Sequence, residues 1–348
     1  MKRAMLCVGI GLLVTGLFGG CRALLRGSRV ALYADSAQQA EQLTAICMAA
    51  GFDQLAPTVG SRRRSVLWRA PAGPWVRGAI LVLHGGGGAH YDFCAPRRLT
   101  RPQVDLVRMA IDRGFAVFLL DATTDVVTDA GGRPCGKRFD FSVLDRPNVD
   151  LPLARALLDQ ELPRLRPDGS AADVFVTGLS TGGYMTTRVG TELAAQITAF
   201  APVAAGDPYS TETDCDPTLS RRQSAKGVLR DVDTGRQITE VGACTETESK
   251  VAREPDLAPA DPLPHVKQLH HENDGIVDLS CMQKNTRRLR ARGHRVEAPY
   301  LARGGRRRAL VHLWREEYNA EIVDFFERAA EDRAGSLADA SRSGEPEG

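Results

Sequence analysis

The chain has 348 residues, 43% of them hydrophobic, which is enough to bury a large core, and α/β architectures of this length are often one domain. Its 45 Lys and Arg nearly balance its 43 Asp and Glu, so the formal net charge is only +2. The basic runs at 62–64 and 306–308 have few aromatic residues near them, and we expect solvated loops and no nucleic-acid partner.

The first 21 residues have the pattern of an export signal. A basic pair at 2–3 precedes an apolar run over 4–18, and two glycines lead directly to Cys21. This ending resembles a bacterial lipoprotein signal, in which the cysteine is lipidated and becomes the first residue of the mature chain. Plain cleavage and an uncleaved anchor are the alternatives. The sequence therefore predicts an exported protein, periplasmic or at the cell surface, that is attached to the membrane if Cys21 carries lipid.

Six further cysteines follow once Cys7 and Cys21 are set aside. In an oxidising compartment they could form up to three disulfides in any of fifteen pairings, whereas in a reducing one they would be buried thiols. No C-x-x-C spacing and no close cysteine–histidine pair resembles a zinc site, so we expect no metal and no cofactor. The six are Cys47, Cys94, Cys135, Cys215, Cys244 and Cys281.

Apolar strand-like runs alternate with helical patterns along most of the chain. Strands are predicted over 65–70, 78–83, 115–120, 173–177, 197–204, 266–271 and 295–301, and helices over 36–50, 99–113, 150–165, 184–195, 283–292 and 317–330. A long polar connection occupies 121–149. This alternation predicts an α/β fold, with a mostly parallel central sheet and helices on both faces.

The domain organisation follows from the same pattern. Residues 22–64 form an N-terminal segment, 65–330 the main domain, and the composition from 331 to 348 predicts a disordered tail. Residues 206–264 have no buried-element pattern and are too long for an ordinary loop, so we expect a lid-like insertion after the sixth strand.

The pentapeptide Gly178-Leu-Ser-Thr-Gly182 lies between a predicted strand and a predicted helix, which places Ser180 on a tight strand-to-helix turn. This is the geometry of a nucleophile elbow. The turn forces an unusual backbone conformation on the serine, and it brings strand and helix so close that side chains at the two glycines would collide.

A serine hydroxyl needs a general base and an acid that orients the base. Asp274 follows a late predicted strand, and His312 precedes the closing helix, so the order along the chain is Ser, acid, His. Asp278 and Glu272 are the alternative acids.

These features resemble the α/β-hydrolase superfamily and, within it, secreted esterases of the polyhydroxybutyrate depolymerase and feruloyl esterase type. The resemblance implies that Ser180 is the nucleophile, His312 the base and Asp274 the acid. It is carried by His84-Gly85-Gly86, Asn148-Val149-Asp150, the segment from Gly178 to Met185, Ala201-Pro-Val-Ala204, Asp274 with Val277, and His312-x-Trp314.

An oxyanion hole for this chemistry needs two backbone N–H groups. The first is expected from Thr181 and the second from Gly86, with Gly87 as the alternative. His84 is expected to brace the glycine loop.

The predicted function is a serine hydrolase that cleaves small or polymeric carboxylic esters through an acyl-enzyme. A peptidase or amidase with the same triad is one alternative, and a non-catalytic surface protein is another.

Overall fold

The computed structural model describes residues 37–127, 134–141, 147–209, 228–230, 237–239, 257, 260–304 and 309–343. The predicted export signal with Cys21, and most of the 206–264 insertion with Cys215 and Cys244, lie outside the described residues. Within the described part of the chain, no helix has both the length and the apolar character that crossing a membrane requires.

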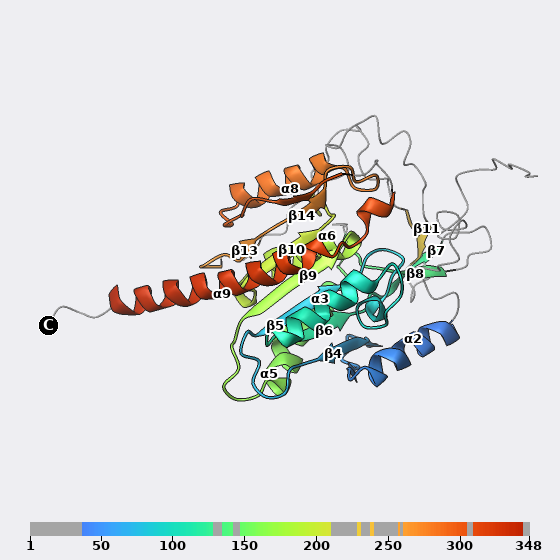
Figure 1. The fold of residues 1–348 in the computed structure, drawn as a ribbon, viewed down its shortest axis with the longest axis horizontal. Helices are drawn as coiled ribbons and strands as arrows, with labels where there is room; N and C mark the ends of the chain where they lie inside the picture. Colours follow the sequence, from blue (N-terminus) through green and yellow to red (C-terminus); the bar gives the residue numbers. More distant parts are fainter. Residues whose placement is uncertain are drawn as a thin grey trace, which may run out of the picture.

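The centre of the molecule is a mostly parallel sheet (Figure 1). Its strands lie side by side in the order β1-β4-β6-β5-β9-β10-β14-β15, and β13 (His265–Val266) pairs with β10. The pairs from β6 to β15 are parallel, whereas β4 is antiparallel to both of its neighbours. The bounds are β1 Asp53–Leu55, β4 Val66–Arg69, β5 Ala79–Leu83, β6 Ala116–Leu120, β9 Val174–Leu179, β10 Ala199–Val203, β14 Leu269–His271 and β15 Tyr300–Ala302.

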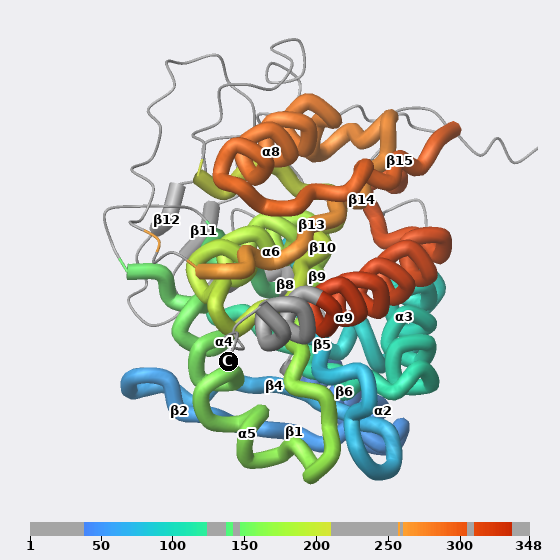
Figure 2. The backbone as a smooth tube through the Cα atoms, turned by 90° about the vertical axis from the view of Figure 1, so that its left-hand side faces the viewer, coloured from blue at the N-terminus to red at the C-terminus, as the bar shows by residue number. Residues whose placement is uncertain are grey.

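Helices cover both faces of this sheet, which explains why its strands read as uninterrupted apolar runs. Alternate residues of β5 enter different cores: Ile80 and Val82 face one side, and Leu81 faces the other. The first side is covered by α2 (Ala37–Ala49), α3 (Arg101–Asp112) and α9 (Glu317–Ser343), of which α3 and α9 pack together (Figure 2). The second is covered by α4 (Leu151–Ala156), the π-helical turn η2 (Leu157–Glu161), α5 (Leu162–Leu165), α6 (Thr181–Glu192) and α8 (Leu279–Ala291). The predicted fold class is confirmed, and the insertion follows β10, the sixth main-sheet strand in chain order.

A second, antiparallel sheet differs from the sequence prediction. Its order is β12-β11-β7-β8, and it joins two segments in which no strand was predicted. These strands have only three to five residues each, which is too short for an alternating pattern, so periodicity does not reveal them. The sheet contains β7 (Thr124–Val127), β8 (Pro134–Arg138), β11 (Val228–Arg230) and β12 (Gln237–Thr239), and a small hairpin pairs β2 (Thr58–Val59) with β3 (Arg62–Arg63).

Both ends of the described chain belong to the domain. The disulfide Cys47–Cys94 joins α2 to the short 3₁₀ helix η1 (His90–Phe93), and β1 adds an edge strand to the main sheet. Cys281 is disulfide-bonded as well.

At the C-terminal end, α9 continues to Ser343, where the sequence predicted a disordered tail from residue 331. The Ala, Glu and Arg residues of 331–343 are strong helix formers, which accounts for the difference.

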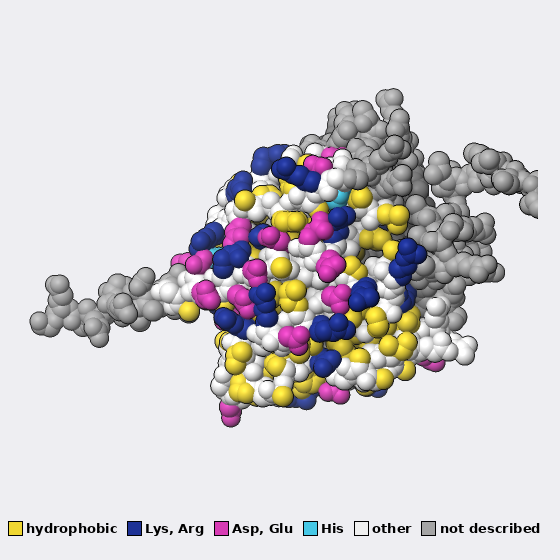
Figure 3. Space-filling view, viewed as in Figure 1, with side chains coloured by type: hydrophobic (Ala, Val, Ile, Leu, Met, Phe, Trp, Pro, Cys, Tyr) yellow, Lys and Arg dark blue, Asp and Glu magenta, His cyan; other side chains and the backbone are white. Residues whose placement is uncertain are grey.

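The surface carries mixed charge. On the face shown in Figure 3, basic and acidic side chains are interspersed rather than gathered by sign. Ion pairs account for part of this pattern, for example Arg113 with Glu327 at 3.0 Å, which ties α9 to the end of α3. No patch of a single sign of charge dominates this face.

Candidate active site

Ser180 occupies the predicted elbow between β9 and α6. Its backbone has φ 53° and ψ −116°, a strained conformation for a residue other than glycine, and its N–H donates to the carbonyl of Val203 at 2.9 Å. A Cβ on Gly182 would lie 2.4 Å from the carbonyl oxygen of His84, and one on Gly178 would lie 2.6 Å from the carbonyl oxygen of Gly182. The close approach that the sequence predicted at these two glycines is confirmed.

Asp274 lies buried in the turn after β14, and backbone and side-chain donors surround its carboxylate. Oδ1 accepts the N–H groups of Ile276 at 2.8 Å and Val277 at 3.1 Å, and Oδ2 lies 2.7 Å from Nδ1 of His312. Burial alone would raise the pKa of Asp274, but the charge and hydrogen bond of His312 outweigh it and hold the pKa below its usual value. The carboxylate is therefore ionised at neutral pH.

This ionised partner determines which ring nitrogen of His312 carries the proton. An ionised carboxylate can only accept, so Nδ1 donates to Asp274 and Nε2 keeps a lone pair for accepting a proton. Two residues further on, Trp314 donates a hydrogen bond from Nε1 to Oδ1 of Asn319 at 2.8 Å. Its ring packs edge-on against that of Phe93, with the ring centroids 5.6 Å apart. These contacts fix the loop that contains η4 (Ala309–His312), the short 3₁₀ helix that ends at His312, against the start of α9.

The two alternative acids have other partners. Asp278 caps α8, accepting the N–H of Ser280 at 2.9 Å. Glu272 is exposed and accepts the N–H of Gly304 at 3.0 Å. The acid in contact with His312 is Asp274.

His270 is a neighbour of this pair that the sequence analysis did not use. Its Nε2 lies 3.0 Å from the carbonyl of Val277, to which it donates, and 3.8 Å from Oδ2 of Asp274. Burial lowers the pKa of His270, so the ring is neutral at pH 7. His270 thus braces the turn that holds Asp274, and its place at the end of the strand before the acid was the available signal.

The residues expected to form the oxyanion hole lie next to each other. Thr181 is the first residue of α6, and a Cβ on Gly86 would lie 3.1 Å from its Cγ2. The N–H of Gly87 donates to the carbonyl of Lys137 at 2.7 Å, so this alternative donor is engaged by β8. The expected donor from the glycine loop, Gly86, is the one that lies against Thr181.

Hydrogen bonds of the His84 side chain connect the glycine loop to the residues after β6. Nε2 of His84 accepts the N–H of Ala122 at 3.2 Å, so Nδ1 carries the proton and donates to the carbonyl of Gly85 at 2.8 Å. Asp121 lies beside it, accepts the N–H of His90 at 3.4 Å, and forms an ion pair with Lys137. Burial alone would raise the pKa of Asp121, but the surrounding histidines and Lys137 hold it well below its usual value. The expected bracing role of His84 agrees with these contacts.

All of these groups lie at the carboxyl ends of neighbouring parallel strands. Gly86 follows β5, Ser180 follows β9 and Asp274 follows β14, and β9, β10 and β14 are adjacent in the sheet. Ligands of open parallel sheets bind at this edge. Among the described residues, no group of three or more His, Cys, Asp or Glu side chains is arranged to hold a metal ion.

Comparison with known proteins gives distant structural likenesses. No family model matches the chain, and no curated protein matches it at a significant level. The chain is similar to solved structures of the esterase PE8 (14% identity, 80% of this chain and 99% of that one, TM-score 0.46) and of a Pyrobaculum calidifontis esterase (16%, 83% and 92%, TM-score 0.49). A Pyrococcus horikoshii acylaminoacyl peptidase is similar at 17% identity over 80% of this chain but only 41% of that one, with a TM-score of 0.48.

The chain's own topology defines its fold. A parallel sheet with an antiparallel second strand, a strained serine between the fifth strand and its helix, and the chain order Ser, Asp, His are together the pattern of one architecture. The chain has the α/β-hydrolase fold.

Proposed function

We propose that the chain is a serine hydrolase that cleaves carboxylic esters through an acyl-enzyme. Ser180 is the nucleophile, His312 the general base and Asp274 the acid that orients it. The backbone N–H groups of Gly86 and Thr181 form the oxyanion hole.

The proposed reaction has two symmetrical halves. Oγ of Ser180 attacks the ester carbonyl while its proton moves to Nε2 of His312, and Asp274 stabilises the imidazolium that forms. Collapse of the tetrahedral intermediate breaks the ester C–O bond, and the alcohol leaves with the proton from Nε2. Water then attacks the acyl group in the same way and regenerates Ser180. Each oxyanion donor is expected to lower the barrier by about 3 kcal/mol.

The observation that carries the proposal is the 2.7 Å contact between Nδ1 of His312 and Oδ2 of Asp274. These two residues are 38 positions apart and come from different elements, yet they pair in the orientation that leaves Nε2 as a base. A surface protein without catalysis has no need of a buried, ionised acid that orients a histidine in a chain with a strained serine elbow.

The test combines covalent labelling with a substrate screen. A fluorophosphonate probe should label the wild-type chain and leave Ser180→Ala unlabelled. The screen compares p-nitrophenyl esters of graded chain length, a feruloyl ester and a peptide amide. Turnover of esters supports the proposal, turnover of the amide alone assigns a peptidase or amidase, and no labelling with no turnover assigns a non-catalytic surface protein.

We propose further that the protein is exported and attached to the membrane through a lipidated Cys21. The disulfide Cys47–Cys94 supports an oxidising compartment. Replacing Cys21 with Ser should release the protein from the membrane fraction or block its processing. An unchanged mass and unchanged fractionation would count against lipidation.

A further inference from the structure

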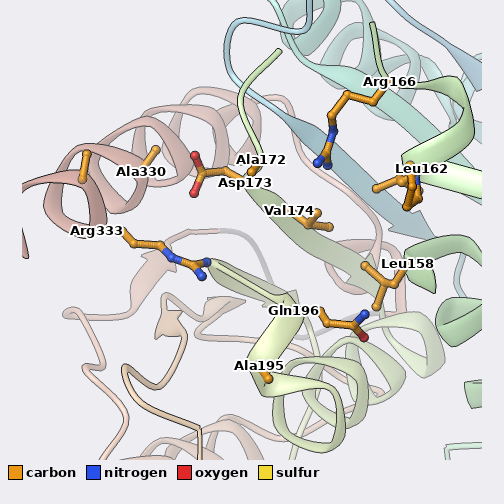
Figure 4. A pocket seen from close by; sticks show the side chains of 12 residues that line it. Leu158, Leu162, Arg166, Ala172, Asp173, Val174, Ala195, Gln196, Ala330 and Arg333 are labelled. Atoms are coloured by element: carbon orange, nitrogen blue, oxygen red, sulfur yellow. The ribbon is translucent and has the colours of Figure 1, made fainter. Parts of the chain in front are cut away.

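A cavity of about 390 Å³ lies at the opposite end of β9 from Ser180 (Figure 4). Its floor is the start of β9 at Val174, and an apolar wall comes from Leu158 and Leu162. The facing wall is the C-terminal part of α9, where Ala330 and Ala334 leave room because both side chains are small. The continuation of α9 beyond residue 330 therefore completes the cavity.

Two arginines supply its positive charge. Figure 4 shows the guanidinium groups of Arg166 and Arg333 directed inward from opposite sides of Val174. Nε of Arg166 is buried and has no hydrogen-bond partner. Burial lowers the pKa of Arg166, although the nearby charge of Asp173 opposes this shift. An anion placed beside Arg166 would relieve this cost by accepting from the guanidinium.

The third charged group is held in place by its own contacts. Oγ1 of Thr198 donates to Oδ1 of Asp173 at 2.9 Å. Oγ1 of Thr198 also accepts a hydrogen bond from Nη1 of Arg333 at 2.8 Å. Thr198 thus fixes both side chains at the rim. Two guanidinium groups against one carboxylate leave the cavity with one excess positive charge.

We propose that this cavity binds a small amphiphilic monoanion, a carboxylate with a short alkyl chain. A guanidinium presents planar N–H donors that match a carboxylate, and the less buried apolar residues of the lining, Pro163, Ala195 and Ala330, lie beside the space for the chain. A single excess charge suits a monoanion better than a phosphate dianion, which would also face Asp173. The volume lies in the range of small-molecule sites.

The proposed site is separate from the candidate active site. The strand β9 is six residues long, which places Val174 about 20 Å from the elbow. Substrates of open parallel sheets bind at the carboxyl edge, and this cavity is at the amino edge. The inference does not depend on catalysis, because binding is an equilibrium property that can be measured without turnover.

The experiment is calorimetric titration of the full chain with octanoate, and with 1-octanol as its uncharged counterpart. Octanoate should bind saturably, and Arg166→Gln and Arg333→Gln should each weaken it about tenfold or more, since each removes a charge-assisted hydrogen bond. The matched control is Arg164→Gln. Arg164 lies on α5, which ends just before Arg166, but it is exposed and paired with Glu161, so its loss should leave octanoate binding unchanged.

A second variant tests the cavity without touching a charge. Ala334 is exposed on α9, so Ala334→Phe should fold normally while it fills the space, and octanoate binding should be lost. Equal affinity for octanol and octanoate would overturn the proposal. So would the absence of saturable octanoate binding to the wild-type chain, or binding that survives both arginine variants and Ala334→Phe.

Discussion

Replacing Asp274 with Asn changes the proton position on His312 with little change in shape. Oδ1 of Asp274 accepts two backbone N–H groups, from Ile276 and Val277. An amide at this position keeps its oxygen there, because its NH₂ group could not accept from either N–H. The NH₂ group then faces Nδ1 of His312 and donates to it, which moves the imidazole proton to Nε2. The ring can no longer take the proton of Ser180.

The loss should be close to that of removing the base. The variant lacks both the correct tautomer and the charge that stabilises the imidazolium, and we expect kcat to fall on the order of 10⁴-fold, about 5 kcal/mol in the barrier. KM should change little, because Asp274 is buried away from the substrate. The matched control is Asp278→Asn: Asp278 caps α8, and Asn caps helices as well as Asp does.

The assay is hydrolysis of a p-nitrophenyl ester as a function of pH, with circular dichroism as a check on folding. An Asp274→Asn variant that keeps more than about a tenth of the wild-type kcat would contradict this reasoning, as would an equal loss in Asp278→Asn. Stability gives an independent readout. The lowered pKa of Asp274 means that its ionised form stabilises the fold above about pH 4, and this contribution disappears as the pH falls through the folded-state pKa. The stability difference between wild type and Asp274→Asn should therefore narrow in acid.

Three further predictions concern the proposed nucleophile and base, the glycine of the elbow, and the disulfide. Ser180→Ala and His312→Ala should each reduce ester hydrolysis on the order of 10⁴-fold or more with the fold intact, and retained turnover in either would remove that residue from the mechanism. Gly182→Ala should destabilise the domain by about 3 kcal/mol or prevent folding, because its Cβ would come within 2.4 Å of two carbonyl oxygens; an unchanged urea midpoint would contradict the close approach. The double variant Cys47→Ser with Cys94→Ser opens a loop that spans 47 residues, and chain entropy predicts a loss of up to about 4 kcal/mol in the free energy of unfolding, measurable in urea against the oxidised wild type.

The parts of the site that the sequence predicted are those with local signatures. The serine elbow needs glycines at two fixed offsets, so Gly178 and Gly182 mark it directly. Asp274 and His312 were found from their positions relative to predicted strands and helices. The structure places Nδ1 of His312 2.7 Å from Oδ2 of Asp274, and their catalytic roles stay a prediction.

What the sequence did not predict depends on contacts between distant segments. Strands β7 and β11 are about a hundred residues apart, and with four and three residues each is too short for periodicity to reveal it. The disulfide pairing could not be chosen from fifteen alternatives until the fold brought Cys47 to Cys94. His270 reads as one more strand residue until the turn after β14 folds back onto it.

The N-terminal segment, to which no role was assigned from the sequence, is connected to the proposed base by a short chain of contacts. Cys47 on α2 is bonded to Cys94, the residue after Phe93, and Phe93 packs against Trp314, two residues from His312. The contact between Trp314 and Asn319 then joins this loop to α9. A histidine on a loop keeps a fixed distance to its acid only if the loop is held from both sides, and here α2 and α9 hold it. The segment is thus part of the support of the site, because the loop that carries His312 rests on the element to which α2 is covalently attached.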